Sequence, residues 1–347
     1  MEGQRKKIVI RDVAKLSGVA VSTVSRVLTN KKNVSKGTEK RVLEAIEKLD
    51  YVPSVIARSL RKKAAQIIGV ILPIMTNPFF VEIVHGVEEV AFNNKYLVVL
   101  CNSAEEAERE ALYFEIFKSQ LVSGVIYCGS TESLQEGRYI KHIKDMYKKG
   151  IPIVLVDREI EGESTSVVAI DNELASFNAT KYCLNLGHKN IAFIAGSLKV
   201  KKFQERLKGY KKALIQSGAR LNEELMKEGD MTIRGGRMAT KELLKKRPFP
   251  SAIFASTDLM AIGVLKEIQE NGLNVPGDIS VIGWDDIPIA SLVTPPLTTV
   301  VEPAHKMGKE AANLLLRQIE GEVSTGIKVI LDTEIVIRNS TAPYKEP

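Results

Sequence analysis

Four polar side chains interrupt an apolar stretch near the N terminus. They are Ser22, Thr23, Ser25 and Arg26, in the run VAVSTVSRVL. Because Val24, Val27 and Leu28 recur at helical intervals, the polar groups fall on the outer face of a short helix. Hydroxyls and a guanidinium on one exposed face can donate hydrogen bonds to the phosphates and base edges of DNA.

The elements that must hold this face are two short helices. Between Val13 and Leu28, apolar residues stand at helical spacing on both sides of Gly18, which predicts two helices of about two turns joined by a sharp turn. The second helix of such a helix-turn-helix fits the DNA major groove. Spacing alone is also consistent with a helical hairpin in an all-helical core.

The charge of the chain favours the first interpretation. Residues 1–66 hold 16 Lys and Arg against 6 Asp and Glu, a net charge of +10, whereas the other 281 residues hold 33 and 36, a net charge of −3. A basic excess at one end indicates a local module that binds a polyanion, and nucleic acid is the first candidate.

A small helical domain and a basic link precede the rest of the chain. Ser35 can cap a third helix that runs to about Leu49, and Pro53 ends it. We therefore place a helix-turn-helix domain at 1–53, a hinge helix or linker at 54–65, and an effector-binding and dimerisation domain at 66–347. By composition, the link is equally consistent with an ordinary solvated linker.

From about Ile67 the rhythm of the sequence changes. Short β-rich runs such as IIGVIL, GVIYCG and PIVLVD alternate with longer amphipathic segments, which predicts parallel strands with crossover helices in a doubly wound fold. Two such series predict two α/β lobes with a ligand crevice between them. We place the N-lobe at about 66–170 and 298–303, and the C-lobe at about 171–297 and 304–340.

Charged residues follow several of the predicted strands. Asp157 and Arg158 come directly after PIVLV, Asp171 follows VVAI, and Asp285 follows ISVIGW. The carboxyl ends of parallel strands meet at the crevice, so these side chains are candidates to bind a ligand. The alternative is that the aspartates merely cap the next helix.

Several classes of protein are disfavoured. No apolar run is as long as a membrane span and the N terminus lacks the core of a signal peptide, so we expect a cytoplasmic protein. Cysteines without CxxC spacing and scattered histidines predict neither disulfides nor a metal site. Without a GxGxxG, GxxxxGK[ST] or GxSxG motif, we expect no enzyme and no cofactor. A solute-binding protein of a transport system remains an alternative.

Characteristic motifs occur along the whole chain. In order they include IRDVAKLSGVAVSTVSRVL, VSKGTEKRVLEAIEKLDYVP, IARSLR, NPFF, GHKNIAFIAG, ERLKGY, STDLMAIG, ISVIGWDD and PPLTTV. This series resembles the lac repressor and gal repressor family of bacterial transcription regulators. The resemblance implies a helix-turn-helix domain and hinge helix followed by a core of two doubly wound lobes, like that of periplasmic binding proteins, whose last strands cross between the lobes.

The resemblance also implies residues that bind DNA. Base contacts fall on Val21, Ser22 and Arg26, of which Arg26 can donate a bidentate pair to guanine. Phosphate contacts are expected from Thr23, Ser25, Ser35, Thr38 and Tyr51. The sequence departs from the family at Ala20, where Ser or Thr usually caps the helix.

The family's hinge helix matches the link. Ala57, Arg58, Ser59 and Leu60 are then expected to enter the minor groove, where Leu60 from each subunit wedges between base pairs and kinks the duplex. A half-site is too short for specificity, so a homodimer on a near-palindromic operator is expected. The apolar stripe of the helix Val81 to Asn94 is a candidate for the subunit interface, or for intramolecular core.

In the resembling family, the arginine that matches Arg206 and the aspartate that matches Asp285 bind a small-molecule effector, and the residues that match Phe79 and Phe80 lie against its apolar face. Two departures obscure the ligand: Met231 stands where the family often has an aromatic residue, and Thr257 where it has asparagine. A sugar is the first expectation, and a purine or nucleoside is open. Another reading is a global carbon catabolite regulator that answers to a phosphorylated partner protein.

Overall fold

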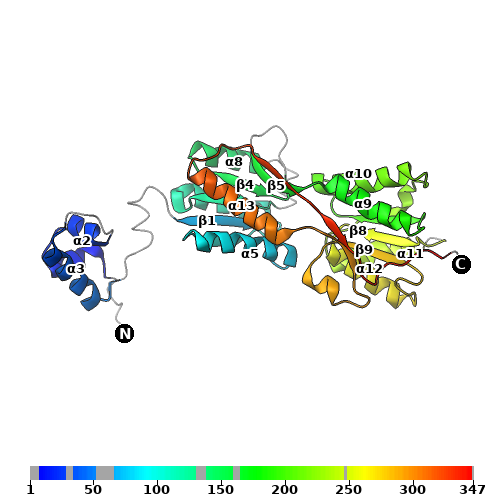
Figure 1. The fold of residues 1–347 in the computed structure, drawn as a ribbon, viewed down its shortest axis with the longest axis horizontal. Coiled ribbons are helices and arrows are strands. Elements are labelled where there is room, and N and C mark those ends of the chain that lie inside the picture. The colour runs from blue at the N-terminus through cyan, green and yellow to red at the C-terminus, as the bar shows by residue number, and fades with distance from the viewer. Residues whose placement is uncertain are drawn as a thin grey trace. The chain divides into compact units, whose positions relative to one another are not determined.

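The computed structural model of the chain describes residues 8–28, 34–51, 66–129, 138–158, 165–245 and 248–345. It divides into two compact units, Met1–Ala65 and Gln66–Pro347, which are taken separately below (Figure 1). The predicted hinge residues Ala57, Arg58, Ser59 and Leu60 lie outside the described residues. Within the described ranges, no helix combines the length and apolar character needed to cross a membrane.

The first unit is a three-helix domain. Its helices are α1 (Ile10–Ser17), α2 (Val21–Leu28) and α3 (Lys36–Lys48). Val13, Val24 and Val42, one from each helix, are fully buried and form its core. Leu16 of α1 and Leu43 of α3, although apolar, are about half exposed, at 46% and 52%. So small a domain has too little interior to bury every apolar residue.

Gly18 makes the turn between α1 and α2 possible. It ends α1 in the left-handed conformation, with φ 66° and ψ 34°, and its N–H donates to the carbonyl of Ala14. A Cβ at this position would meet no atom within 4 Å, so the strain of a substitution comes from the backbone alone.

We therefore expect Gly18→Ala to destabilise the helix-turn-helix by roughly 1 kcal/mol, because an L-residue in the left-handed region costs about 1–2 kcal/mol. Amide hydrogen exchange in α1 and α2 measures this, and should accelerate there but not in the second unit. Gly18→Asn is the control and should cost less, since asparagine tolerates this conformation. Equal exchange in wild type and Gly18→Ala would contradict the prediction.

The second unit contains two lobes, each with a six-stranded sheet. The N-lobe sheet has the order β11-β5-β4-β3-β1-β2, with all neighbours parallel. Its strands are β1 (Ile67–Leu72), β2 (Leu97–Asn102), β3 (Gly124–Tyr127), β4 (Ile153–Val156), β5 (Ser166–Ile170) and β11 (Lys328–Leu331). Its helices are α5 (Pro78–Asn93), α6 (Ala107–Ile116), a π-helical turn η1 (Phe117–Leu121), α8 (Arg138–Lys148) and α13 (Ala304–Ile319).

The C-lobe repeats this plan in the order β12-β10-β9-β8-β6-β7, with only the β10–β12 pair antiparallel. Its strands are β6 (Ile191–Ala195), β7 (Met226–Glu228), β8 (Ala252–Ala255), β9 (Ser280–Asp285), β10 (Thr298–Val301) and β12 (Glu334–Val336). Its helices are α9 (Asn172–Asn185), α10 (Lys201–Gln216), α11 (Ile233–Leu244) and α12 (Asp258–Glu270), with short 3₁₀ turns η2 (Glu223–Leu225) and η3 (Pro288–Ser291). The predicted doubly wound lobes are confirmed.

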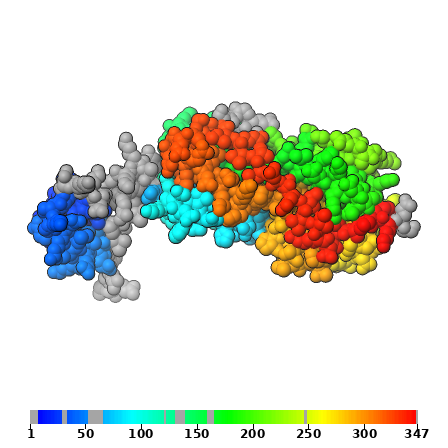
Figure 2. Space-filling model, viewed as in Figure 1, coloured from blue at the N-terminus to red at the C-terminus, as the bar shows by residue number. Residues whose placement is uncertain are grey.

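The lobe boundaries predicted for the returning segments are wrong. Strand β10, at 298–301, pairs in the C-lobe sheet, whereas α13 and β11, within 304–340, belong to the N-lobe. The chain then crosses back, and β12 joins the C-lobe (Figure 1). Figure 2 shows this C-terminal part of the chain lying over both lobes.

The apolar stripe of α5 is intramolecular core. Ile83 and Val87 are fully buried, and α5 packs against α13. The two helices approach closely at paired glycines: a Cβ on Gly86 would lie 2.0 Å from the carbonyl oxygen of His305, and one on Gly308 2.0 Å from that of Ile83. The buried residues of the stripe therefore have their partner within the chain.

Candidate functional site

Helix α2 presents the polar face that its spacing predicts. Ser22 and Arg26 are exposed, Thr23 and Ser25 are half-buried, and Val24 points into the core. The carbonyl of Ala20 accepts the N–H of Thr23 at 2.9 Å and of Val24 at 3.2 Å, so Ala20 holds the capping position with a side chain that cannot accept a hydrogen bond. Val21, the first residue of the helix, is half-buried.

The other predicted phosphate contacts have structural roles as well. The Ser35 hydroxyl caps α3, accepting the N–H of Thr38 at 3.3 Å and donating to the Thr38 hydroxyl at 2.9 Å. Tyr51 is half-buried against the three-helix core. Both hydroxyl-bearing residues at the start of α3 are thus fixed in position by each other.

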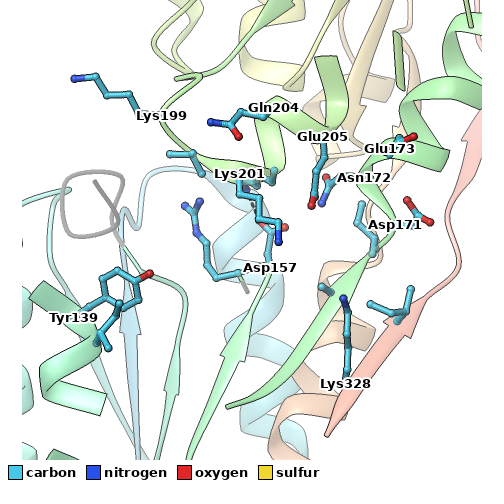
Figure 3. Close-up of a pocket in the computed structure, with 17 residues that line it drawn as sticks. Tyr139, Asp157, Asp171, Asn172, Glu173, Lys199, Lys201, Gln204, Glu205 and Lys328 are labelled. Carbon is cyan, nitrogen blue, oxygen red and sulfur yellow. Dashed lines mark hydrogen bonds and ion pairs between the residues drawn. The ribbon is translucent and has the colours of Figure 1, made fainter. Parts of the chain in front are cut away.

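A polar pocket of about 600 Å³ lies between the lobes of the second unit (Figure 3). On the N-lobe side, its wall includes Tyr139, Asp157, Arg158 and Lys328. The C-lobe contributes the first turns of α9 and α10, with Asp171, Asn172 and Glu173 from one and Lys199, Lys201, Lys202, Gln204 and Glu205 from the other. Asp157, Arg158 and Asp171, which follow the carboxyl ends of strands, therefore line one pocket, as their positions in the sequence predict.

Asp157 is the most buried carboxylate of the pocket wall. It follows β4 in the left-handed region, with φ 55°, is 4% exposed, and forms an ion pair with Lys202 across the crevice. Although burial raises the pKa of Asp157, the charges of Lys202, Arg206 and Arg158 outweigh it and hold that pKa below its usual value. Its second oxygen, Oδ1, has no hydrogen-bond partner although it is buried.

Arg206 lies behind the pocket wall, 1% exposed. Its Nε donates to Asn172 Oδ1 at 2.8 Å, Nη1 to the carbonyl of Ser256 at 2.8 Å, and Nη2 to Glu302 Oε2 at 2.7 Å. The guanidinium also stacks on the ring of Trp284, 3.9 Å from its centroid. Each guanidinium nitrogen therefore has a protein acceptor, and Arg206 is not among the residues that line the pocket; the contact with a ligand that the resemblance implies stays a prediction.

Glu302 and Ser256 complete this network and sequence reasoning missed both. Glu302 Oε2 also accepts the indole N–H of Trp284 at 2.7 Å, while Glu302 Oε1 and the Ser256 hydroxyl are buried without a partner. Glu302 directly follows β10, so the rule that selected Asp285 could have found it. Orphaned buried oxygens are unfavourable unless a ligand or water satisfies them.

Four of the remaining predicted residues, Phe79, Phe80, Thr257 and Met231, are not among those that line the pocket. Phe79 and Phe80 are 3% and 7% exposed and pack edge to face. The centroid of the Phe79 ring lies 5.9 Å from Lys202 Nζ. Asp171 and Thr257 cap α9 and α12 through their side chains, which is the alternative role considered for strand-end residues. Met231 is half-buried with φ 63°.

Acidic groups are crowded around Arg206. Burial, Glu302 and Asp258 raise the pKa of Asp285 well above its ordinary value, and burial raises those of Asp258 and Glu302 to about 7. Four carboxylates, Asp157, Asp258, Asp285 and Glu302, face three cations, Lys202, Arg206 and Arg158. Part of the cluster is therefore protonated near neutral pH.

Asp285→Asn should change how stability depends on pH. A carboxyl whose pKa is raised on folding stabilises the protein fully below its unfolded pKa, and this contribution is lost as the pH rises through the folded pKa. As the pH rises above the usual titration range of an aspartate, wild type should therefore lose stability relative to Asp285→Asn, which has no carboxyl to ionise. Urea denaturation at several pH values measures the difference, and parallel curves would contradict it.

Comparisons with known proteins agree with this layout. Residues 9–54 match the family described as bacterial regulatory proteins, lacI family, and residues 180–341 match the periplasmic binding protein-like domain. Catabolite control protein A of Priestia megaterium is 36% identical over 335 residues, 96% of this chain and 99% of that protein. The HTH-type transcriptional repressor PurR of Vibrio campbellii is 34% identical over 333 residues, 95% and 98% of the two chains.

Among solved structures, the lac repressor dimer bound to operator and the anti-inducer ONPF matches with a TM-score of 0.84 at 27% identity. The match covers 97% of this chain and 100% of that one. It therefore extends over the helix-turn-helix and both lobes.

Proposed function

Because this chain belongs to the lacI family of bacterial regulatory proteins and is a DNA-binding transcriptional regulator, we propose that it represses transcription as a homodimer on a near-palindromic operator, under the control of a small molecule bound between its lobes. One observation carries the proposal: the same chain combines a basic three-helix domain that exposes Arg26 with a polar pocket between two lobes. A transport protein or an enzyme needs only the second of these.

Base reading is assigned to α2. Arg26 is exposed and carries a planar fork of donors, which suits guanine, while Ser22 beside it can donate to a base or a phosphate. Thr23, Ser25, Ser35, Thr38 and Tyr51 are assigned to phosphates. Leu60 keeps its proposed role as a minor-groove wedge.

A dimer needs an apolar surface that the fold leaves uncovered. Strand β2 is the edge of the N-lobe sheet, and Leu97 and Leu100 on it are 59% and 36% exposed. Val81 on the neighbouring α5 is 46% exposed. An exposed apolar edge of this kind favours pairing with a second copy, and sedimentation of the wild type against Leu97→Lys tests it.

The effector is assigned to the pocket, where unpartnered oxygens need hydrogen-bond donors. Asp157 Oδ1 in the wall, with Glu302 Oε1 and the Ser256 hydroxyl behind it, suits a ligand rich in hydroxyl groups, which favours a sugar over a purine or nucleoside. Arg206 then acts as a positioning residue that holds Asn172, itself part of the wall.

Regulation results from an energetic coupling between the effector pocket and the DNA-binding surface. Ligand between the lobes changes their relative position, and this change reaches the DNA-binding units through the hinge. By reciprocity, operator binding alters effector affinity by the same factor.

A second candidate is a global carbon catabolite regulator that answers to a phosphorylated partner protein, and the 36% identity with catabolite control protein A favours it. The two candidates separate when purified chain is tested alone: a small molecule that changes operator affinity without any partner supports the first.

Salt dependence tests the regulator itself. A chain that neutralises 6–10 phosphates should lose about 10³–10⁵ in DNA affinity between 50 and 200 mM salt. Fluorescence anisotropy with a DNA duplex measures this. An affinity that is weak and independent of salt would contradict the proposal.

A further inference from the structure

The pocket between the lobes holds a buried guanidinium with one unpartnered nitrogen. Arg158 is 7% exposed, and its Nε and Nη2 donate only to backbone carbonyls, of Cys128 at 3.2 Å and Gly129 at 3.3 Å. Its third nitrogen, Nη1, is buried and has no hydrogen-bond partner. No ion pair joins Arg158 to a carboxylate within the residues that the structure describes. Burying a guanidinium without an ion pair and with an unpartnered nitrogen is unfavourable, so an anion that accepts from Nη1 would stabilise the protein.

The first turn of α10 faces the same pocket. No side chain caps α10 at Val200 and its first turn has no acidic residue, whereas Asp171 caps α9. The N–H groups and positive end of the dipole at such a terminus attract anions. Lys199, Lys201 and Lys202 stand at this terminus, and Figure 3 shows Lys199 and Lys201 on the same side of the pocket.

The pocket wall offers groups of both signs. It contains five cations, Arg158, Lys199, Lys201, Lys202 and Lys328, and four carboxylates, Asp157, Asp171, Glu173 and Glu205. Lys202 forms an ion pair with Asp157, and Glu173 forms ion pairs with Lys208 and Lys212, which are outside the wall. Asp157 Oδ1 is still unpartnered, so the wall keeps a hydrogen-bond acceptor as well as the guanidinium of Arg158.

We infer that the effector is an anionic sugar, a phosphate ester or a sugar acid, whose acidic group is bound by Arg158 and the N terminus of α10 while its hydroxyls donate to Asp157. This inference rests on the proposed function, since it names the ligand class of the same pocket. A guanidinium and helix N–H groups give an anion charge-assisted hydrogen bonds that a neutral sugar cannot form.

Inorganic phosphate is the probe that tests the anion site. Thermal unfolding of the full chain is followed as phosphate replaces chloride at constant ionic strength. The wild type should be stabilised, Arg158→Gln should lose that increment, and Lys199→Gln, at the exposed rim, should keep only part of it. Lys241→Gln, an exposed lysine on α11 outside the pocket, is the matched control and should behave as wild type.

General stabilisation by phosphate affects all four proteins alike, so the difference between Arg158→Gln and wild type is the measured quantity. Lys199→Gln keeps the test valid if Arg158→Gln fails to fold. Equal stabilisation of wild type and the pocket variants, or none at all, would overturn the inference.

Neutral sugars and their anionic counterparts are then compared to identify the chemical class of the effector. Calorimetry compares glucose with glucose 6-phosphate and gluconate, and ribose with ribose 5-phosphate, and the anionic member of at least one set should bind roughly tenfold tighter or better. Tighter binding by the phosphate or by the acid tells the two sources apart. If a neutral sugar binds as tightly as its anionic forms and still changes operator affinity, the charge assignment is wrong and the regulator stands. Failure of salt-dependent DNA binding would instead remove the proposed function.

Discussion

Replacing Arg26 with alanine is expected to weaken binding to the operator by between about 30-fold and about 10⁴-fold. One bidentate contact with guanine is worth about 1–3 kcal/mol of discrimination, and a dimer makes it in both half-sites, so the loss counts twice. Arg26 is exposed on α2, the helix assigned to the major groove, so truncation should leave the three-helix core intact. Anisotropy with an operator selected from random duplexes, and with a scrambled duplex at the same salt, measures the loss.

Two variants separate base reading from charge. Arg26→Lys keeps the positive charge but lacks the planar fork, so it should recover non-specific affinity and little of the specificity. Arg41→Ala removes an exposed charge from α3 instead, and should weaken both duplexes by a similar, smaller factor. If Arg26→Ala weakened operator and scrambled duplex equally, Arg26 would position the domain on phosphates rather than read bases.

The helix-turn-helix was predictable because its signals are local. Gly18, the spacing of Val13 and Val24, and the cap at Ser35 each act within a few residues, and α1, α2 and α3 begin and end close to where these signals place them. The membership of the lacI family and the two doubly wound lobes are likewise confirmed.

The crossing between the lobes was not predictable from the same kind of signal. Strands β10 and β11 have four residues each, TTVV and KVIL, and nothing in so short an apolar run tells which sheet it will join. The choice depends on partners far away: β10 lies beside β9, while β11 lies beside β5. The lobes predicted for the returning segments are therefore wrong.

The pocket was only half predictable for a similar reason. Asp157, Arg158 and Asp171 could be predicted because residues that directly follow parallel strands tend to line the crevice. Applying this rule requires only the position of one strand and of the residues after it. Arg206 was expected to bind the ligand, which stays a prediction, and its counter-charge comes from Glu302, 96 residues further along the chain. Only the fold brings these two residues together, so spacing could not show that the guanidinium already has a partner.

The ion pair between Arg206 and Glu302 leads to the largest expected effect on stability. Arg206→Met should cost about 3–5 kcal/mol, because it leaves Glu302, which is 2% exposed, as an unpaired buried carboxylate. The double variant with Glu302→Gln should recover much of this loss: the amide is uncharged and its oxygen can still accept the indole N–H of Trp284. Urea denaturation of the wild type, both single variants and the double variant gives the coupling energy.

The destabilisation caused by Arg206→Met depends on pH, because Glu302 can be protonated. Burial and the neighbouring Asp157 raise the pKa of Glu302 to about 7, so the carboxyl is protonated at about pH 5. Replacing Arg206 at that pH therefore leaves no unpaired charge on Glu302. The cost of Arg206→Met should therefore be larger at about pH 8 than at about pH 5, and it should vary little with pH once Glu302→Gln is also present. A cost that is the same at both pH values would contradict the prediction, because it would mean that Glu302 keeps one protonation state between about pH 5 and about pH 8.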